Sequence, residues 1–378
     1  MARSTRNSDA ERETVLEWLN DFPRGENDDL LLQIMRTTMR LDHDDTHRME
    51  LKMINSALKE LRYAAKVFSP YRDVPKVTIF GSARTAPGEP EYQQTVKFAK
   101  KIVDLGYMVI TGAGGGIMEA GHVGAGRDKS FGVNIHLPFE QSANHVIRKD
   151  HKLVNFKYFF TRKVVFIKES AAVVLFPGGF GTLDEGFETL TLLQTGKTSP
   201  IPVVLMDHPG GSYWRDWKEY VIGNVLRRGN ISPEDLYLFK ITEDIDEAIE
   251  DIHGFYRNYH SCRYVGGRLH LRLRHELDDE MLETIHEKFN DILVDGKFER
   301  GSPVPHEDEE SYADLFALRF HFNRRNHGRL RKLIDYLNSC APESAPGCSP
   351  PSRSLDESAA AEEEDSADTG IMRAEPPD

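Results

Sequence analysis

The chain has 378 residues and a mass of 43.0 kDa, which is long for one domain of roughly 100–200 residues. A hydrophobic content of 39% and an aromatic content of 10% exclude a collagen-like or wholly disordered protein. The net charge of −13 is concentrated in residues 341–378, which carry ten acidic side chains and two arginines, whereas the preceding 340 residues carry 46 basic and 51 acidic ones. Because proteins that bind nucleic acid usually carry a basic excess, no nucleic-acid partner is expected.

Cysteine is rare in this sequence. Cys262, Cys340 and Cys348 form neither a C-x-x-C pair nor a disulfide framework, which favours a reducing compartment. The polar N-terminal segment lacks the apolar core of a signal peptide, and no apolar run approaches the ~20 residues that cross a bilayer. We therefore expect a cytoplasmic protein that does not enter a membrane.

The spacing of apolar residues divides the chain into four segments. Residues 9–69 repeat apolar side chains at intervals of three and four, which predicts an N-terminal helical arm over residues 1–75. In residues 76–260, short β-rich runs alternate with helical stretches, as is typical of a doubly wound, Rossmann-like α/β fold with a parallel sheet. Residues 261–340 predict a small α+β unit. Residues 341–378 cannot bury apolar surface, so we expect a disordered acidic tail that the function of the folded part does not need.

The individual elements follow from the same patterns. Strands are predicted at Val77–Phe80, Met108–Thr111, Gly132–Ile135, Ala172–Phe176, Val203–Met206, Tyr237–Ile241 and Arg268–Arg274. Helices are predicted at Glu91–Leu105, Ile117–Arg127, Phe160–Lys168, Leu183–Gln194, Trp214–Leu226, Glu243–Tyr256, Asp278–Leu293 and Arg329–Leu337. A ligand site is expected where the parallel strands end, because their carboxyl ends meet at one edge of the sheet.

Three predicted strands end in turns rich in glycine, Phe80–Arg84, Thr111–Glu119 and Phe176–Glu185. A glycine-rich turn that enters a helix can direct backbone N–H groups and the positive helix end toward a phosphate. Glycines also permit tight turns without any ligand. Three such turns on one sheet favour an anion site over that simpler explanation.

The second turn does not match a dinucleotide site. A G-x-G-x-x-G pattern that starts at Gly112 would need glycine where Ile117 stands, and Asn134 lies near the place of the acidic ribose ligand. The chain also lacks the G-x-x-x-x-G-K-[ST] pattern of a P-loop. A phosphate site without either pattern indicates a mononucleotide or a sugar phosphate.

The third turn allows two interpretations of its glutamate. Thr182 and Glu185 have the spacing of a capping box, in which Thr182 is the N-cap and Glu185 reaches back to an amide. The preceding Pro-Gly-Gly-Phe-Gly holds far more glycine than a cap needs, which favours a ligand site.

Together with Arg162-Lys163 upstream, the run Pro177-Gly178-Gly179-Phe180-Gly181-Thr182-x-x-Glu185 resembles the signature of the Lonely Guy (LOG) family. Members are cytokinin riboside 5′-monophosphate phosphoribohydrolases, and many bacterial members were once labelled possible lysine decarboxylases. The resemblance covers Lys76 to Tyr256. The terminal extensions and Glu119, where plant-type members have glycine, resemble the longer bacterial branch, which includes purine and pyrimidine nucleotide nucleosidases.

The resemblance implies that water cleaves the N-glycosidic bond of a nucleoside 5′-monophosphate, AMP-like or a cytokinin riboside monophosphate, with no cofactor. Free base and ribose 5-phosphate would be the products. Glu185 matches the catalytic glutamate of the family and Arg162 matches its catalytic arginine. Substrate contacts are expected from Ser82, Gly114, Gly115, Gly116, Glu119, Glu140, Lys163, Gly178, Gly179, Gly181 and Thr182. Glu119 would also suit the positive end of a helix, and Lys163 would also suit solvent. The family further implies a homodimer or higher homo-oligomer around the helix Leu183–Gln194.

Other groups favour structural interpretations. A basic run near the C-terminus consists of Arg324, Arg325, Arg329, Arg331 and Lys332. It predicts a solvated helix face or, alternatively, a site for an anionic effector. His43 and His47 are four residues apart but lack a third ligand, so no metal is expected. Trp214 and Trp217 have helical spacing and predict core or interface positions.

Three functions remain open from the sequence. A hydrolase is favoured because Arg162 and Glu185 are both present, whereas a nucleotide-sensing module would need only the phosphate-binding turns. A lysine decarboxylase would need a lysine that anchors pyridoxal phosphate, and nothing in the sequence marks out such a lysine.

Overall fold

The computed structural model of the chain describes residues 27–136, 143–302, 312 and 314–342. These residues belong to two compact units, Met1–Lys59 and Glu60–Asp378. Glu140 and nearly all of the predicted acidic tail lie outside the described residues. Within the described part of the chain, no helix is both long and apolar enough to cross a membrane.

The first unit is helical, as the apolar spacing predicts. It contains helix α2 (Asp28–His43) and the start of helix α3 (Arg48–Phe68). Asp28 and Asp29 begin α2 and His43 ends it, an arrangement of charge that favours the helix dipole. The predicted periodicity is therefore confirmed for the described residues of this region.

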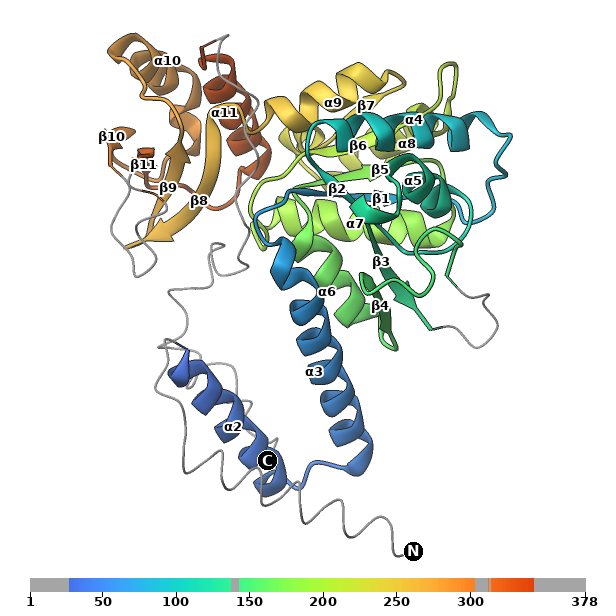
Figure 1. Ribbon diagram of the computed structural model, residues 1–378. Helices are drawn as coiled ribbons and strands as arrows, with labels where there is room; N and C mark the ends of the chain where they lie inside the picture. The colour runs from blue at the N-terminus through green and yellow to red at the C-terminus, as the bar shows by residue number, and fades with distance from the viewer. Residues whose placement is uncertain (1–26, 137–142, 303–311, 313, 343–378) are drawn as a thin grey trace, which may run out of the picture. The chain divides into compact units, whose positions relative to one another are not determined.

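The second unit contains a seven-stranded sheet of order β4-β3-β2-β1-β5-β6-β7 (Figure 1). Its strands are β1 (Lys76–Phe80), β2 (Met108–Thr111), β3 (Ser130–Ile135), β4 (Leu153–Phe156), β5 (Ala172–Leu175), β6 (Val203–Met206) and β7 (Lys240–Thr242). All neighbouring strands run parallel, so the predicted Rossmann-like α/β fold is confirmed. The strand order reverses at β1, between β2 and β5, and ligands of such sheets bind at the carboxyl ends of the strands at this reversal.

Helices cover both faces of this sheet. One face carries α4 (Pro90–Asp104), α5 (Ile117–Ala125) and α9 (Ile245–Gly254), and the other carries the end of α3, α6 (Phe159–Glu169), α7 (Phe180–Gln194) and α8 (Tyr213–Tyr220). Figure 1 draws α4 and α9 above the sheet and α6 and α7 below it. Val77 and Ile79 of β1 are buried on the first face and Phe80 on the second, because successive strand residues point to opposite faces. Trp214 is buried on the second face, so its predicted core position is confirmed.

Three elements of the parallel-sheet region differ from the predicted ones, and strands β8 and β10 beyond it were not predicted. Strand β4 was not predicted, because only its second and fourth residues, Val154 and Phe156, are fully buried and the apolar signal is short. Strand β7 begins later than predicted because Pro233–Leu238 forms a 3₁₀ helix. The predicted helix Trp214–Leu226 is α-helical only to Tyr220 and continues as a π-helix, Val221–Leu226.

Beyond α9, the chain forms an antiparallel sheet of order β10-β11-β9-β8. Its elements are β8 (Tyr259–Val265), β9 (Arg268–Leu273), β10 (Glu299–Gly301) and β11 (Phe316–Phe320), with helices α10 (Asp279–Phe289) and α11 (His327–Ser339). Gly266 and Gly267 form the β8–β9 turn with φ values of 56° and 78°, a conformation that favours glycine. Leu269, Leu271 and Leu273 of β9 are buried, as the alternation predicts.

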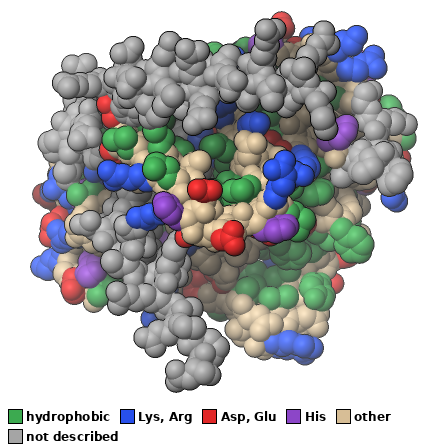
Figure 2. Space-filling view, turned by 90° about the horizontal axis from the view of Figure 1, so that it is seen from below, with side chains coloured by type: hydrophobic (Ala, Val, Ile, Leu, Met, Phe, Trp, Pro, Cys, Tyr) green, Lys and Arg blue, Asp and Glu red, His purple; other side chains and the backbone are tan. Residues whose placement is uncertain are grey.

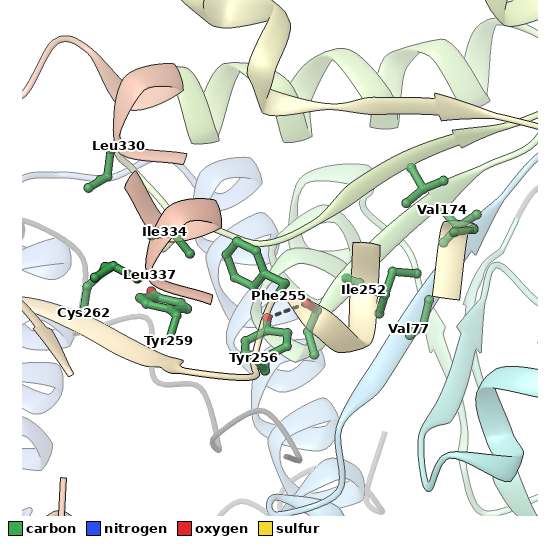
Figure 3. Packing of buried hydrophobic residues seen from close by; sticks show 14 of the residues in the cluster. Val77, Val174, Ile252, Phe255, Tyr256, Tyr259, Cys262, Leu330, Ile334 and Leu337 are labelled. Carbon is green, nitrogen blue, oxygen red and sulfur yellow. Dashed lines mark hydrogen bonds between the residues drawn. The ribbon is translucent and has the colours of Figure 1, made fainter. Parts of the chain in front are cut away.

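The buried core continues from the parallel sheet into this smaller sheet. Figure 3 shows Val77 of β1, Ile252 of α9 and Leu337 of α11 in one apolar cluster. The hydroxyl of Tyr256 donates a hydrogen bond of 2.6 Å to the carbonyl of Ala171. The predicted domain boundary between residues 260 and 261 stays a prediction, since buried packing runs across it.

Asn338 ties the end of α11 to the connection between α9 and β8. Its Oδ1 accepts hydrogen bonds from the N–H groups of Asn258 at 2.9 Å and Tyr259 at 2.8 Å. Its Nδ2 donates to the carbonyl of Phe255 at 2.6 Å. These bonds satisfy buried backbone groups that would otherwise destabilise the fold.

Three residues of the basic run, Arg329, Arg331 and Lys332, lie on α11 and pair with acids. Arg329 lies 2.9 Å from Asp291. Arg331 is buried and pairs with Asp335 at 2.8 Å and with Asp251 at 3.1 Å. The prediction of a solvated helix face is therefore wrong for Arg331, because this side of α11 packs against α9. An anionic effector at the run stays a prediction.

Candidate active site

Backbone hydrogen bonds of Ser82 hold the three glycine-rich turns together at the carboxyl edge of the sheet. Its N–H donates to the carbonyl of Pro177 in the third turn at 3.0 Å. Its carbonyl accepts from the N–H of Ile117 in the second turn at 2.9 Å. Since this N–H is already used, Ser82 would contact a ligand through its side chain, whose Oγ accepts from the N–H of Arg84 at 3.1 Å.

Two glycines of these turns permit close packing. Gly116 has a φ of +62°, and a Cβ there would lie 2.2 Å from the carbonyl oxygen of Ser82. A Cβ at Gly81 would lie 2.5 Å from a side-chain carbon of Ile117. The position of Gly116 thus explains its presence without a ligand.

Asn144 supports the second turn. Its Nδ2 donates to the carbonyls of Ala113 at 3.2 Å and Gly114 at 2.9 Å and lies 3.0 Å from Nδ1 of His122. Nε2 of His122 lies 3.0 Å from the carbonyl of Phe131. Because a carbonyl can only accept, Nε2 carries the proton and Nδ1 accepts from Asn144. Burial lowers the pKa of His122 to about 4, which keeps the ring neutral.

Helix α7 begins earlier than the capping box predicts. Gly179 is its N-cap and Phe180 its first residue, so Thr182 is the third helical residue and Glu185 the sixth. The capping-box interpretation is therefore wrong, because Gly179 takes the extended N-cap conformation before Thr182 is reached. No side chain caps α7, and its first N–H groups need another acceptor.

The third turn leaves open space beside this helix end. A Cβ at Gly178 would lie 2.2 Å from Oγ1 of Thr182, so this glycine permits close packing. The carbonyl of Gly178 accepts from the hydroxyl of Tyr213 at 2.6 Å, which fixes the turn. A Cβ at Gly179 or Gly181 would meet nothing within 4 Å. Uncapped N–H groups beside open space suit an anion such as phosphate.

These turns border a cleft of about 730 Å³, a size typical of small-molecule sites of roughly 300–1,000 Å³. Its lining includes the expected residues Ser82, Gly114, Arg162, Gly178, Gly179, Gly181, Thr182 and Glu185. The expected residues Gly115, Gly116, Glu119 and Lys163 are not among the described residues that line it. The cleft therefore joins the first and third turns with three residues of the second, Gly112, Gly114 and Met118.

The cleft also has lining residues that the sequence did not indicate, Arg84, Met118, Ile135 and Phe159. Arg84 follows Gly81-Ser82-Ala83, so its place in a glycine-containing turn at a strand end was the available signal. Met118 and Ile135 are apolar residues of a predicted helix and a predicted strand, where a core position is the ordinary interpretation. Phe159 lies just before the predicted helix Phe160–Lys168 and is the first residue of α6.

Glu185 is the buried acid of this cleft, with 8% of its surface exposed. Burial raises the pKa of its carboxyl to about 7. The nearby positive charges of Arg162 and Lys163 act in the opposite direction, and the negative charges of Asp184 and Glu188 add to the rise. A carboxyl with this pKa can take up or release a proton near neutral pH.

Arg162 reaches the same cleft from α6. Its guanidinium lies 5.1 Å from the ring centroid of Phe166 and 6.0 Å from that of Phe159. A Cβ at Gly112 would lie 2.8 Å from one of its terminal nitrogens, so Gly112 makes room for this arginine. The predicted pair of Arg162 and Glu185 is brought together by α6 and α7.

Lys163 forms ion pairs with two acidic residues of α7. Its Nζ lies 3.0 Å from a carboxylate oxygen of Asp184 and also pairs with Glu188. Its side chain is only 15% exposed, so the alternative of a solvated lysine is wrong. These contacts link α6 to α7 beside Glu185.

Glu119 has partners of its own. It accepts a hydrogen bond of 3.4 Å from the hydroxyl of Tyr92 and lies 3.7 Å from Nδ1 of His145. It stands in the first turn of α5, where the alternative of favourable helix-dipole placement applies. Its contact with substrate stays a prediction, as does that of Glu140.

A metal ion and pyridoxal phosphate each need particular side chains to hold them. No three His, Cys, Asp or Glu side chains are grouped to hold a metal in the part of the chain that the structure describes. The described residues that line the cleft include no lysine, the residue that would hold pyridoxal phosphate as a Schiff base. The cleft therefore does not fit pyridoxal phosphate.

Acidic and basic side chains are interspersed on the face of the molecule that Figure 2 shows, with hydrophobic side chains between them. This mixture agrees with the nearly balanced charge of residues 1–340.

The fold and the cleft define a Rossmann-like α/β protein with a small-molecule site at its strand ends. Residues 115–252 match the family model described as possible lysine decarboxylase, the label once given to bacterial LOG proteins. The match includes Arg162 and the run Pro177–Glu185, so it supports the resemblance of this signature to that family.

Several solved structures are similar to about half of the chain. They include the molybdenum cofactor binding protein of the phototrophic bacterium Rippkaea orientalis, with 18% identity over 47% of this chain and 94% of that one and a TM-score of 0.34. The molybdenum cofactor carrier protein of Chlamydomonas reinhardtii has 19% identity over 47% and 94%, with a TM-score of 0.33. DNA processing protein A of Helicobacter pylori has 18% identity over 47% and 80%, with a TM-score of 0.33. No curated protein matches the chain.

Proposed function

We propose that this protein hydrolyses the N-glycosidic bond of a nucleoside 5′-monophosphate and releases the free base and ribose 5-phosphate. The observation that carries the proposal is Glu185, a buried carboxyl with a pKa of about 7 in a cleft that it shares with Arg162. Buried carboxyls with raised pKa values are typical of catalytic sites. A module that only binds nucleotides would need no such group.

The phosphate of the substrate would lie at the start of α7. The uncapped N–H groups of the first turn and the open space at Gly179 and Gly181 support this position. The positive end of the helix dipole adds to the attraction. The ribose would then lie next to Glu185, which is on the first turns of the same helix.

In the proposed reaction, the bond between C1′ of the ribose and the base nitrogen breaks as water attacks C1′. The ionised carboxylate of Glu185 stabilises the positive charge that develops on the ribose and accepts the proton of the attacking water. The bonding electrons leave with the base, and a proton neutralises it. Arg162 would hold the substrate or stabilise negative charge on the departing base.

The other wall of the cleft suits an aromatic base. Met118, Ile135 and Phe159 are apolar lining residues, and an aromatic side chain can stack on any base. Such a wall would accept adenine or the adenine of a cytokinin riboside monophosphate, the two substrates that the family resemblance implies.

A panel of nucleoside monophosphates tests the proposal. The purified full chain is incubated with each nucleotide, and free base and ribose 5-phosphate are measured together. Equal amounts of both products are expected from the preferred nucleotide. Tight nucleotide binding without release of either product would replace the hydrolase by the nucleotide-sensing module.

We further propose that the protein is a homodimer or larger homo-oligomer around α7. Phe187 on this helix is 47% exposed, whereas Leu190 packs against the sheet and Gln194 bonds to Asp235 at 2.7 Å. Of these three residues of α7, only Phe187 is therefore available to a second copy. A monomeric mass by light scattering at micromolar concentration would contradict the proposed homo-oligomer.

A further inference from the structure

We infer that Arg84 binds the phosphate of the substrate and makes the cleft select phosphorylated over unphosphorylated nucleosides. This inference rests on the proposed function, because it assigns the phosphate to the same cleft. It adds a residue that lies outside the paired signature of Arg162 and Glu185.

The backbone of Arg84 is fixed beside the third turn. Its N–H donates to Oγ of Ser82 at 3.1 Å, and the N–H of Ser82 donates to the carbonyl of Pro177 at 3.0 Å. The ideal Cβ position of Gly178 lies 2.9 Å from the backbone nitrogen of Ser82. Two short links therefore connect Arg84 to the turn that begins α7.

The guanidinium of Arg84 is available to bind an anion in the cleft. The residue is exposed and lines the cleft. Over residues 27–136, 143–302 and 314–342, no hydrogen bond or ion pair that the structure shows holds its side chain. An exposed arginine on a tethered backbone, with no partner for its guanidinium among the described residues, can bind an anion that enters the cleft.

The other charges of the cleft leave the phosphate in need of a cation. Asp184 and Glu185 line the cleft and bring negative charge. Lys163 is already paired with acids of α7. Arg162 stacks on Phe166 and lowers the pKa of Glu185 through its charge. Arg84 is the remaining arginine among the described residues of the cleft wall.

An arginine also has the geometry that a phosphate requires. Its planar guanidinium can donate two parallel hydrogen bonds to two phosphate oxygens, whereas a lysine acts as a point charge. The backbone N–H groups of α7 would bind the phosphate from the helix side. A nucleoside without phosphate would gain nothing from Arg84.

Binding of ribose 5-phosphate and ribose to the full chain separates this role from catalysis, because neither compound carries a bond to a base. Calorimetry compares the wild-type protein with Arg84→Ala and Arg84→Lys. We expect Arg84→Ala to weaken ribose 5-phosphate about tenfold or more, as for loss of a charge-assisted pair, with weak ribose binding unchanged. Arg84→Lys should recover part of the loss.

Arg228→Ala is the matched control. Arg228 is exposed and does not line the cleft, so this variant removes the same charge elsewhere and should bind ribose 5-phosphate like the wild type. The inference is overturned if Arg84→Ala keeps wild-type affinity for ribose 5-phosphate. It is also overturned if Arg228→Ala loses as much affinity, or if the wild type does not bind ribose 5-phosphate.

Two results distinguish this inference from the proposed function. A protein that binds ribose 5-phosphate through Arg84 but releases no base from any nucleotide supports Arg84 and contradicts the hydrolase. A protein that hydrolyses a nucleotide, and whose Arg84→Ala variant keeps the wild-type ratio of kcat/KM for nucleotide over nucleoside, supports the hydrolase and contradicts Arg84.

Discussion

Asn144 and His122 form a buried pair under the second glycine-rich turn, with Nδ2 of Asn144 3.0 Å from Nδ1 of His122. The same amide group holds the carbonyls of Ala113 and Gly114. Ala113 has a φ of +63°, a conformation that a residue with a Cβ adopts only at a cost in energy. The pair therefore holds the turn in a strained conformation that brings Gly114 to the cleft.

Removing this support should affect substrate binding as well as stability. Asn144→Ala leaves the carbonyl of Gly114 and Nδ1 of His122 without this partner, whereas the carbonyl of Ala113 keeps the backbone N–H of residue 144 at 2.8 Å. The loss should lower the free energy of unfolding by about 1–3 kcal/mol. Relaxation of Ala113 should move the turn and raise KM severalfold. Thermal unfolding and steady-state kinetics measure the two effects.

Asn323→Ala is the control for Asn144→Ala. Asn323 accepts hydrogen bonds from the N–H groups of Arg325 at 3.0 Å and Asn326 at 3.1 Å, and it does not line the cleft. Its loss should lower stability and leave KM unchanged. Equal KM values for both variants would contradict a positioning role of Asn144.

Glu185→Gln should separate catalysis from folding. Under the proposed mechanism, the variant removes the charge that would face the ribose and the base that would accept a proton from water, so turnover should fall on the order of a hundredfold or more. Since helix α7 begins at Phe180, loss of a capping box no longer competes as an explanation. Release of ribose 5-phosphate is the measurement, and wild-type release by Glu185→Gln would end the catalytic assignment.

Asp184→Asn is the adjacent control. The Asp184 side chain is 59% exposed and pairs with Lys163, so the variant removes a neighbouring negative charge without removing a buried one. Turnover should stay within severalfold of the wild type. A loss as large as that of Glu185→Gln would show that the charge of the whole cluster matters.

The pH dependence of both activity and stability follows from the raised pKa of Glu185. If the ionised form is the active one, kcat/KM should fall about tenfold per pH unit below pH 7. The folded-state pKa of about 7 exceeds the ordinary value of 4.5, so the folded protein holds more protons between these values. Ionisation of Glu185 therefore lowers stability as the pH rises through this range.

Glu185→Gln cannot ionise and should be more stable than the wild type at pH 8, by on the order of 1–3 kcal/mol. The difference should disappear at pH 4, where both side chains are neutral. Denaturant titrations at the two pH values measure it. A variant that is equally or less stable than the wild type at pH 8 would contradict the raised pKa.

The two kinds of glycine in the turns should respond oppositely to alanine. At Gly181 a Cβ meets open space, so Gly181→Ala should keep or raise stability, by about 0.4–1 kcal/mol, yet weaken nucleotide binding because the methyl group enters the phosphate space. At Gly116 the positive φ and the nearby carbonyl of Ser82 should make Gly116→Ala clearly destabilising. Unfolding and nucleotide affinity measured on both variants check this contrast.

The sequence predicted the parallel sheet and the cleft partners Arg162 and Glu185 because each depends on a local pattern. Apolar runs mark buried strands, and the Pro-Gly-Gly run marks the turn before α7. The glycine pattern does not show which glycine faces a ligand: Gly181 faces open space, whereas Gly116 packs against Ser82. That difference depends on contacts between distant turns.

Long-range contacts also explain the other errors. The basic residues of α11 have the spacing of a solvated face, but Arg331 meets Asp251 of α9, eighty residues earlier. Strand β8 reads Tyr-His-Ser-Cys-Arg-Tyr-Val, which has no clear alternation, and it forms because β9 pairs with it across a two-glycine turn. A short window of sequence does not contain Asp251 beside Arg331, and the pattern of β8 by itself does not show its pairing with β9.

Arg331 should be needed for folding because of Asp251. Burial raises the pKa of the Asp251 carboxyl, and the charge of Arg331 opposes that rise. Oδ2 of Asp251 is buried without a hydrogen-bond partner among the described residues. Arg331→Met therefore leaves an uncompensated buried carboxylate, and breaking such a pair costs about 3–5 kcal/mol.

The loss of stability in Arg331→Met should increase with pH. Without Arg331, the folded-state pKa of Asp251 rises further above its ordinary value of 3.8, so the folded protein takes up a proton more readily than the unfolded one. Stability of Arg331→Met should then be greater below that raised pKa and fall as the pH increases through it. The deficit relative to the wild type should be larger at pH 8 than at pH 5. Arg329→Met, which frees the more exposed Asp291, should show a smaller deficit that varies little over this range. Denaturant unfolding of both variants at pH 5 and pH 8 measures these deficits in stability. A deficit of Arg331→Met that does not change with pH would mean that lost packing, and not the charge of Asp251, is responsible.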